Sequence, residues 1–246
     1  MITGKPLVLI ADDDPVSLAY LRAAIERCGC AAIAVADAQA ALLVLQANAA
    51  DLLVIDRRMP VTDGVALLRA ARNQGIRAPA IASSAELEPA MIAALHAAGF
   101  ADTLLKPASL ATIRRLLQRF LALDANAPNT DVPRIETSEP IQLLDDAAAL
   151  TATGGDREAL SALRRLFIRE LDAIANEVKA MPTAAELVLG ERLHRLRASC
   201  GFCGAAALGA AALRLEQAIR VGTGEEEAAA FLELCAATKQ ALAAQA

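Results

Sequence analysis

Charged and hydroxyl side chains follow several short apolar runs in the first half of the chain. They are Asp12, Asp13, Asp56, Ser84 and Lys106. Clustered carboxylates repel one another unless a cation joins them, and Mg²⁺ prefers such hard oxygen ligands and takes phosphate oxygens as further ones. A lysine and a hydroxyl opposite the metal can hold the other oxygens of a phosphoryl group. The set therefore predicts a Mg²⁺ site for phosphoryl transfer.

A second candidate is His194, one of two histidines in the chain. The apolar line from Leu193 to Cys203 is expected to face inward, which places His194 at the edge of the solvent face of its helix. Arg192, Arg195 and Arg197 surround it with positive charge. An accessible imidazole with nearby cations can take up and return a phosphoryl group. The alternative interpretation is a solvated surface histidine.

Five βα units are expected to position the residues of the first half. Helical periodicity over residues 15–28, 37–48, 64–74, 86–97 and 109–123 alternates with strand-like runs at residues 7–10, 32–35, 52–55, 80–83 and 103–105. This alternation predicts an α/β domain, a doubly wound five-stranded parallel sheet with helices on both faces. In the strand order 2-1-3-4-5, the first and third strands are neighbours, so the carboxylates would converge at one edge.

The character of the chain changes after residue 123. Residues 124–140 contain Pro, Asn and Asp without periodicity, which indicates a linker between domains at 5–123 and 141–245. Beyond it the strand signals vanish. A long helix is expected after the N-cap Asp156, a second after Thr183, a third ended by Gly222, and a last one from Glu225. This pattern predicts an antiparallel four-helix bundle.

The composition excludes several classes of protein. The 246 residues are 56% hydrophobic but only 2% aromatic, and the net charge of −5 argues against a nucleic-acid partner. No secretory signal is recognised, and the longest uncharged stretch, Ala198–Leu213, is shorter than the roughly 20 residues that cross a membrane. We therefore expect a cytoplasmic protein with no membrane partner.

The five cysteines give no disulfide framework, because their number is odd and the chain is long. Cys200 and Cys203 have the spacing of half a zinc site or of a redox pair. Their helical context favours two small buried hydrophobic residues, with metal or redox use as the alternative.

Four motifs of the first half together resemble the receiver domain of two-component response regulators, over residues 5–123. They are Asp12-Asp13, Asp56-Arg57-Arg58-Met59-Pro60 with Asp63-Gly64, Ser84-Ala85, and Lys106-Pro107. The resemblance implies a flavodoxin-like fold. It also implies that Asp56 accepts the phosphoryl group, and that Asp12, Asp13 and Asp56 hold Mg²⁺ together with the backbone carbonyl of Arg58.

The same resemblance assigns the remaining site residues of the first half. Ser84 would bond the phosphoryl group as the switch hydroxyl. Lys106 would pair with the phosphate, and a cis Lys106-Pro107 bond is expected. The chain departs from the family at Thr103, where receivers usually carry an aromatic residue that follows the switch hydroxyl inward. That departure leaves the phosphorylation chemistry in place but questions the coupling to output.

The segment from His194 to Ala205 resembles the signature of histidine phosphotransfer (HPt) domains, a likeness that extends over about residues 141–245. The familiar form has Gly where this chain has Ala198. The resemblance implies that His194 is phosphorylated and that Arg197 stabilises the phosphate. The arginines around His194 would complement the acidic pocket of a receiver, so we expect them to dock receivers.

We therefore expect a two-component phosphorelay signalling protein. It would exchange phosphoryl groups with a sensor or hybrid histidine kinase and with other receiver or HPt domains, using Mg²⁺. It would not be an enzyme in the usual sense, because no kinase domain is recognised and the receiver catalyses only its own phosphoryl transfer. A homodimer through the receiver is left open.

Two alternatives remain from the sequence. One is an adaptor that binds kinase or receiver partners without passing phosphate, which Thr103 keeps open. The other is a phosphatase that uses Asp12, because Asp12-x-Asp14 also fits the opening motif of haloacid-dehalogenase-type phosphatases.

Overall fold

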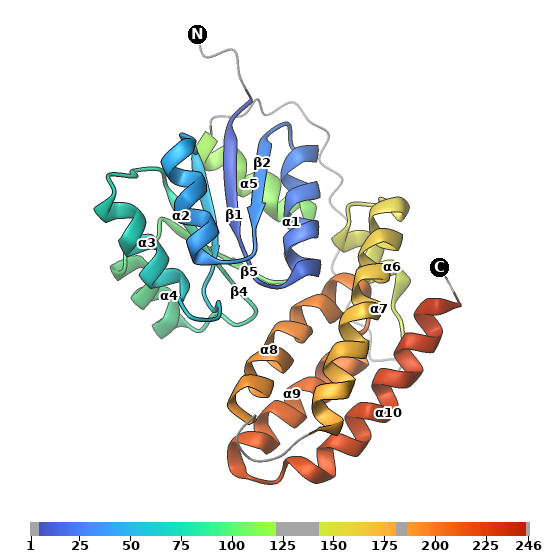
Figure 1. Ribbon diagram of the computed structural model, residues 1–246. Coiled ribbons are helices and arrows are strands. Elements are labelled where there is room, and N and C mark those ends of the chain that lie inside the picture. Colours follow the sequence, from blue (N-terminus) through green and yellow to red (C-terminus); the bar gives the residue numbers. More distant parts are fainter. Residues whose placement is uncertain (1–4, 122–142, 181–185, 245–246) are drawn as a thin grey trace. The chain divides into compact units, whose positions relative to one another are not determined.

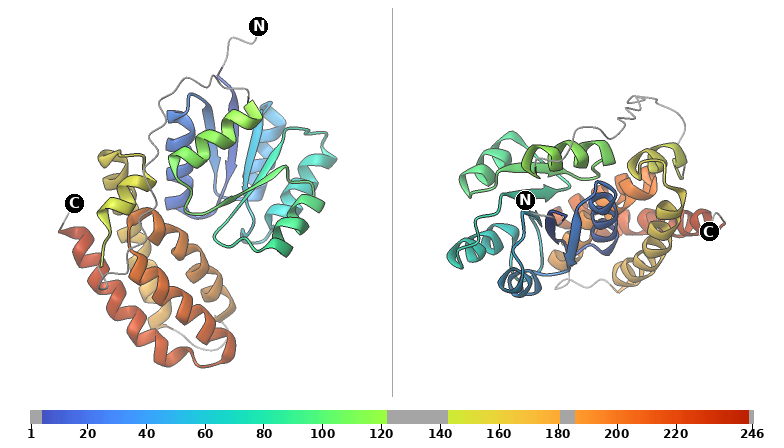
Figure 2. Two further views of the ribbon diagram at one scale, coloured as in Figure 1. Left: turned by 180° about the vertical axis from the view of Figure 1, so that it is seen from behind. Right: turned by 90° about the horizontal axis from the view of Figure 1, so that it is seen from above.

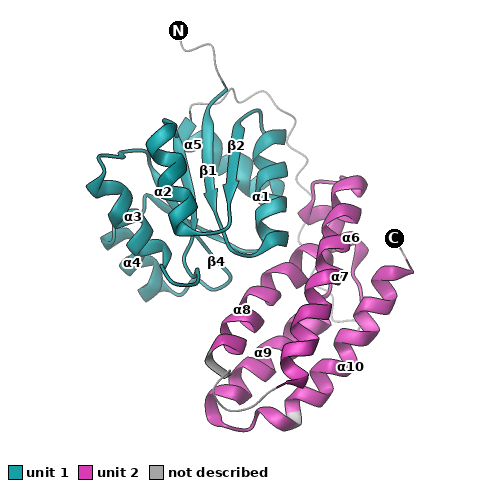
Figure 3. Ribbon diagram, viewed as in Figure 1, with its two compact units in different colours: residues 1–131 teal, residues 132–246 magenta. Residues whose placement is uncertain are grey.

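The computed structural model describes residues 5–121, 143–180 and 186–244. The chain divides into two compact units, residues 1–131 and residues 132–246 (Figure 3). The division falls inside the expected linker, but residues 124–140 lie outside the described residues, and so does the expected cap Thr183. No helix of the described part of the chain is both long and apolar enough to cross a membrane.

The first unit contains a five-stranded parallel sheet (Figure 1). Its strands are β1 (Leu7–Ala11), β2 (Ala31–Val35), β3 (Leu52–Asp56), β4 (Ala80–Ser84) and β5 (Asp102–Leu105). The strand order β2-β1-β3-β4-β5 is the one expected from the sequence. Each residue of β3 and β4 is buried, as expected for a strand that is covered on both faces.

Five helices cover the two faces of this sheet (Figure 2). They are α1 (Pro15–Arg27), α2 (Ala38–Ala47), α3 (Gly64–Asn73), α4 (Pro89–Ala97) and α5 (Leu110–Leu121). Asp14 and Asp37 cap α1 and α2 through backbone N–H groups, as predicted. The expected start of α4 at Glu86 is wrong, because Pro89 takes the first turn of the helix and disfavours helical backbone in the residue before it.

At Gly64, where the loop after β3 meets α3, the chain passes close to the backbone at the end of β3. A Cβ at this position would lie 2.4 Å from the carbonyl oxygen of Asp56, so only glycine lets α3 begin there. Within the loop, Val61 has a φ of 69° and Thr62 donates its N–H to the carbonyl of Pro60 at 2.7 Å, which forms a γ-turn. The side chain of Val61 is fully exposed.

Helices are the only regular secondary structure among the described residues of the second unit. Its helices are α6 (Asp146–Ala152), α7 (Arg157–Lys179), α8 (Glu186–Cys203), α9 (Ala206–Val221) and α10 (Gly224–Ala243). Each of the four long helices packs against two of the others, in the cyclic order α7, α8, α9, α10. The short helix α6, which packs on α7 and α8, was not predicted because its run of alanines has no polar and apolar faces.

The C-terminal end of α8 is held by contacts from α6 and α7. Arg164 donates to the carbonyl of Cys203 at 3.1 Å and to Asp146 at 2.6 Å. The carbonyl of Gly204 accepts the N–H of Asp145 at 2.8 Å. Gly204 has a φ of 77°, and a Cβ there would lie 2.3 Å from the carbonyl oxygen of Asp145. The end of α8 therefore requires glycine both for its backbone conformation and for the close approach of α6.

The substitution Gly204→Ala is expected to destabilise the second unit by about 2–4 kcal/mol, since strain and collision act together. Gly155→Ala is the matched control, because Gly155 has a similar φ of 79° but no atom within 4 Å of its Cβ position. It should cost about 1 kcal/mol. Urea unfolding followed by helical circular dichroism measures both, and equal losses would contradict the close contact between α6 and α8.

Candidate functional site

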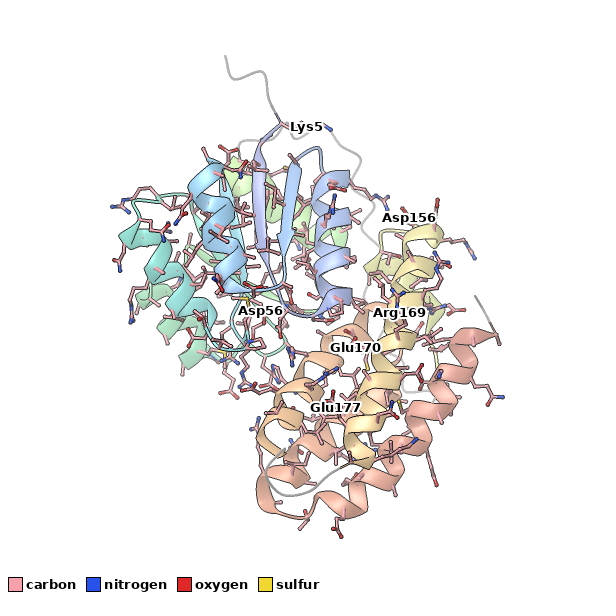
Figure 4. All side chains as sticks on the ribbon, in the orientation of Figure 1. Lys5, Asp56, Asp156, Arg169, Glu170 and Glu177 are labelled. Carbon is pink, nitrogen blue, oxygen red and sulfur yellow. The ribbon has the colours of Figure 1, made fainter. Side chains whose placement is uncertain are left out.

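Three carboxylates from two neighbouring strands meet at the carboxyl edge of the sheet. Carboxylate oxygens of Asp12, Asp13 and Asp56 all lie within 4.8 Å of one another, and Figure 4 labels Asp56 at this edge. Asp12 and Asp13 follow β1, and Asp56 is the last residue of β3. The predicted convergence of these residues is confirmed.

Lys106 is buried against the same carboxylates. Its Nζ lies 2.6 Å from Oδ2 of Asp12 and 2.7 Å from Oδ1 of Asp56. The Lys106-Pro107 peptide bond is cis, as expected. Burial alone would lower the pKa of Lys106, but the charges of Asp12 and Asp56 outweigh burial and raise it. Lys106 is therefore a permanent cation that joins the ends of β1 and β3 from the segment after β5.

The carboxyl group of Asp56 is under opposing influences. Burial is the largest of them and, together with the charge of Asp12, raises its pKa to about 6. The charge and hydrogen bond of Lys106 oppose this shift, as does the N–H of Arg58, which donates to Oδ2 at 3.2 Å. A further cation beside Asp56 would therefore favour its ionised form.

The donor set fits a divalent cation. Asp12 is fixed by Ser17, which donates to its Oδ2 at 2.7 Å, and by the N–H of Asp14, which donates to its Oδ1 at 3.1 Å. Three carboxylates against one ammonium leave an excess of negative charge, and all the donors are hard oxygens, as Mg²⁺ prefers. The role of the Arg58 carbonyl as a further ligand stays a prediction.

Ser84 is the last residue of β4, next to β3, and among the described residues it makes no hydrogen bond to the cluster. The register pairs Asp56 with Ser83, which brings Ser84 to the end of the neighbouring strand. Its Oγ accepts hydrogen bonds from Nε of Arg57 at 3.4 Å and from the N–H of Glu86 at 3.3 Å. Arg57 was not singled out from the sequence. An arginine directly after a buried acid is the signal that could have found it.

The expected exposure of His194 is wrong. The histidine lies on α8 as predicted, but only 4% of its surface is exposed. The prediction assumed one inward stripe on this helix. Instead α8 packs against α6, α7 and α9, and Ala198, Ser199 and Phe202 are buried along with the predicted apolar line. Cys200 and Cys203 belong to that line and are buried free cysteines, as the preferred interpretation held.

The arginines near His194 form ion pairs with acidic residues. Arg192 donates to Glu177 of α7 at 2.6 Å, and Figure 4 labels this glutamate. Arg197 donates to Glu216 of α9 at 3.4 Å. The expected purely positive collar is therefore partly neutralised within the bundle, while Arg195 lies half-buried on the same helix.

Glu216 is the residue of this region that sequence reasoning missed. It is 2% exposed, and its Oε1 lies 3.7 Å from Nδ1 of His194 and 2.5 Å from Nη2 of Arg220. Burial alone would raise its pKa, but the nearby ring of His194 and the charges of Arg220 and Arg197 lower it. A lone carboxylate between apolar residues one turn away, Ala212 and Ile219, was the available signal.

Comparison with known proteins gives a family for the first unit. The response regulator receiver domain family matches residues 8–118. Sensor histidine kinase GacS of Pseudomonas protegens is 30% identical in an alignment that covers 93% of this chain and 25% of that protein. Signal transduction histidine-protein kinase BarA of Escherichia coli K12 is 26% identical, with 72% of this chain and 20% of that protein covered. The chain thus spans about a quarter or less of these curated relatives.

A solved structure is similar over the same half of the chain. The receiver domain of sensor histidine kinase PA1611 from Pseudomonas aeruginosa, which has a magnesium ion in its active site cleft, is 30% identical. It covers 49% of this chain and 99% of its own, with a TM-score of 0.45. The family match and the observed strand order carry the assignment. Residues 8–118, which hold the acidic cluster, Ser84 and Lys106, therefore form a response regulator receiver domain.

Proposed function

We propose that this chain is a phosphorelay protein in which Asp56 accepts a phosphoryl group from the phosphohistidine of a partner histidine kinase. The observation that carries the proposal is the buried cluster of Asp12, Asp13 and Asp56 with Lys106 bonded to two of its members. Asp12, Asp13 and Asp56 would hold Mg²⁺, which supplies positive charge to the oxygens of the transferring group. The chain would catalyse only this transfer to itself.

In the transfer step, an oxygen of the Asp56 carboxylate attacks the phosphorus of the phosphohistidine. A P–O bond forms and the P–N bond breaks, with its electron pair remaining on the ring nitrogen. The ring leaves as neutral imidazole because its other nitrogen carries a proton. The ammonium of Lys106, already 2.7 Å from Asp56, is placed to stabilise charge on a phosphoryl oxygen. Burial of Asp56 limits access of hydrolytic water.

We further propose that His194 exchanges a phosphoryl group with a receiver aspartate, as an HPt domain does. The cyclic packing of four long helices supports this role, and so does the alignment with the GacS kinase, which extends into the second unit. Glu216 would favour the tautomer with the proton on Nδ1 and leave the lone pair on Nε2 for phosphorus. Because His194 is buried, the step requires the imidazole to become accessible when a partner docks.

Incubation with acetyl phosphate and Mg²⁺ is expected to place one acyl phosphate on Asp56, found by mass spectrometry and lost in alkali. Asp56→Asn should abolish it. Asp13→Asn should weaken Mg²⁺ binding about tenfold or more, since a ligand is lost. Asp14→Asn is the control, because it removes a neighbouring charge but keeps the helix cap. Labelling that does not depend on Asp56 would exclude the receiver chemistry.

A phosphorylated receiver partner is expected to give a second phosphate that acid removes and alkali does not. It should be absent in His194→Gln and present in His96→Gln, which changes the other histidine. If Asp56 is phosphorylated but His194 never is, the second unit does not pass phosphate, and the adaptor interpretation applies to it.

Glu216→Gln is expected to lower the free energy of unfolding of the second unit at pH 7 by about 1–2 kcal/mol. The lowered pKa of Glu216 means that its contribution is complete above its unfolded pKa and is lost as pH falls through the folded value. The two proteins should therefore converge in stability at acid pH. Urea unfolding at pH 7 and pH 3 tests this, and a constant difference would contradict it. Glu177→Gln, at the more exposed pair with Arg192, should cost less.

A further inference from the structure

Arg57 sets its guanidinium beside the hydroxyl of Ser84. The N–H of Arg57 donates to the carbonyl of Ser83 at 2.9 Å, which continues the pairing of β3 with β4 by one residue. Arg57 and Ser84 therefore stand next to each other across the two strands. Nε of Arg57 lies 3.4 Å from Oγ of Ser84. The residue after the acceptor is thus bonded to the residue expected to respond to phosphorylation.

The hydroxyl of Ser84 accepts hydrogen bonds from two donors outside the acidic cluster. A hydroxyl has two acceptor lone pairs, and those of Ser84 face the donors of Arg57 and Glu86. Within the described residues, Ser84 makes no hydrogen bond to Asp12, Asp56 or Lys106. A rotation of the Ser84 side chain that carries its oxygen toward a phosphoryl group on Asp56 would break the contact with Arg57.

Among the described residues, the guanidinium of Arg57 makes its hydrogen bond to Ser84. Its Nη2 is buried and has no hydrogen-bond partner among these residues. Loss of the Ser84 contact would cost the guanidinium a further hydrogen bond, which opposes the movement of Ser84.

We propose that Arg57 is a positioning residue that keeps the Ser84 hydroxyl outside the phosphoryl site until Asp56 is phosphorylated. This inference rests on the proposed function of Asp56. The phosphoryl group offers the hydroxyl a doubly charged acceptor, which is stronger than the long contact to Arg57. Arg57 thereby sets the balance between the two positions of Ser84 and opposes the switched state.

The test is a double-mutant cycle on the affinity for beryllofluoride, a phosphoryl analogue, in saturating Mg²⁺. The proteins are the full chain and its variants Arg57→Ala, Ser84→Ala and the double variant. Loss of the arginine charge changes affinity in both backgrounds and cancels in the cycle. The remaining coupling reports the contact between the two side chains. We expect Arg57→Ala to favour binding about twofold to fivefold more when Ser84 is present than when it is absent.

Equal effects of Arg57→Ala in the two backgrounds would overturn the proposal. A coupling of opposite sign would also overturn it, since Arg57 would then present Ser84 to the phosphoryl group. Arg58→Ala is the matched control, which removes the neighbouring charge and should show no coupling to Ser84. Arg57→Lys repeats the cycle with a milder change if Arg57→Ala fails to fold. Absence of binding to the wild-type chain would instead contradict the function proposed for Asp56.

Discussion

The receiver site depends on the balance between the mutual repulsion of three carboxylates and the single ammonium of Lys106. The parallel sheet brings Asp12, Asp13 and Asp56 together because β1 and β3 are neighbours and end at the same edge. Lys106 offsets part of that repulsion by bonding one oxygen of Asp12 and one of Asp56. The remaining negative charge makes the same edge receptive to a divalent cation. The contacts that stabilise this edge of the sheet are thus also the contacts of the candidate site.

In the second unit, the charged groups around His194 are arranged differently. There, Glu216 is the buried charge, and His194, Arg197 and Arg220 are the groups around it. Its surroundings lower its pKa, whereas those of Asp56 raise the pKa of that acid. The first site has one ammonium bonded to two of its three carboxylates, whereas the second has two arginines around one carboxylate.

Much of the receiver fold could be predicted because short stretches of sequence indicate its strands, its helices and the residues at the strand ends. Each candidate site residue stands at the end of a strand, and the alternation of strands and helices orders those ends, so the convergence of Asp12, Asp56 and Lys106 could be predicted. The exposure of a side chain in a helical bundle, by contrast, depends on helices that are distant in the chain. Whether His194 faces solvent depends on how α6, α7 and α9 pack around α8, which the periodicity of one helix does not contain. Arg57 and Glu216 were missed for the same reason, since their roles come from partners distant in the chain.

The γ-turn at Val61 has a consequence for how the loop beside Asp56 responds to load. A β-branched residue at positive φ costs on the order of 1–3 kcal/mol, and the loop holds it between Arg57 and Gly64, which are joined by a hydrogen bond of 3.1 Å. A rearrangement that returned Val61 to negative φ would release this strain, while the paired residues of β3 and β4 would gain nothing comparable by moving.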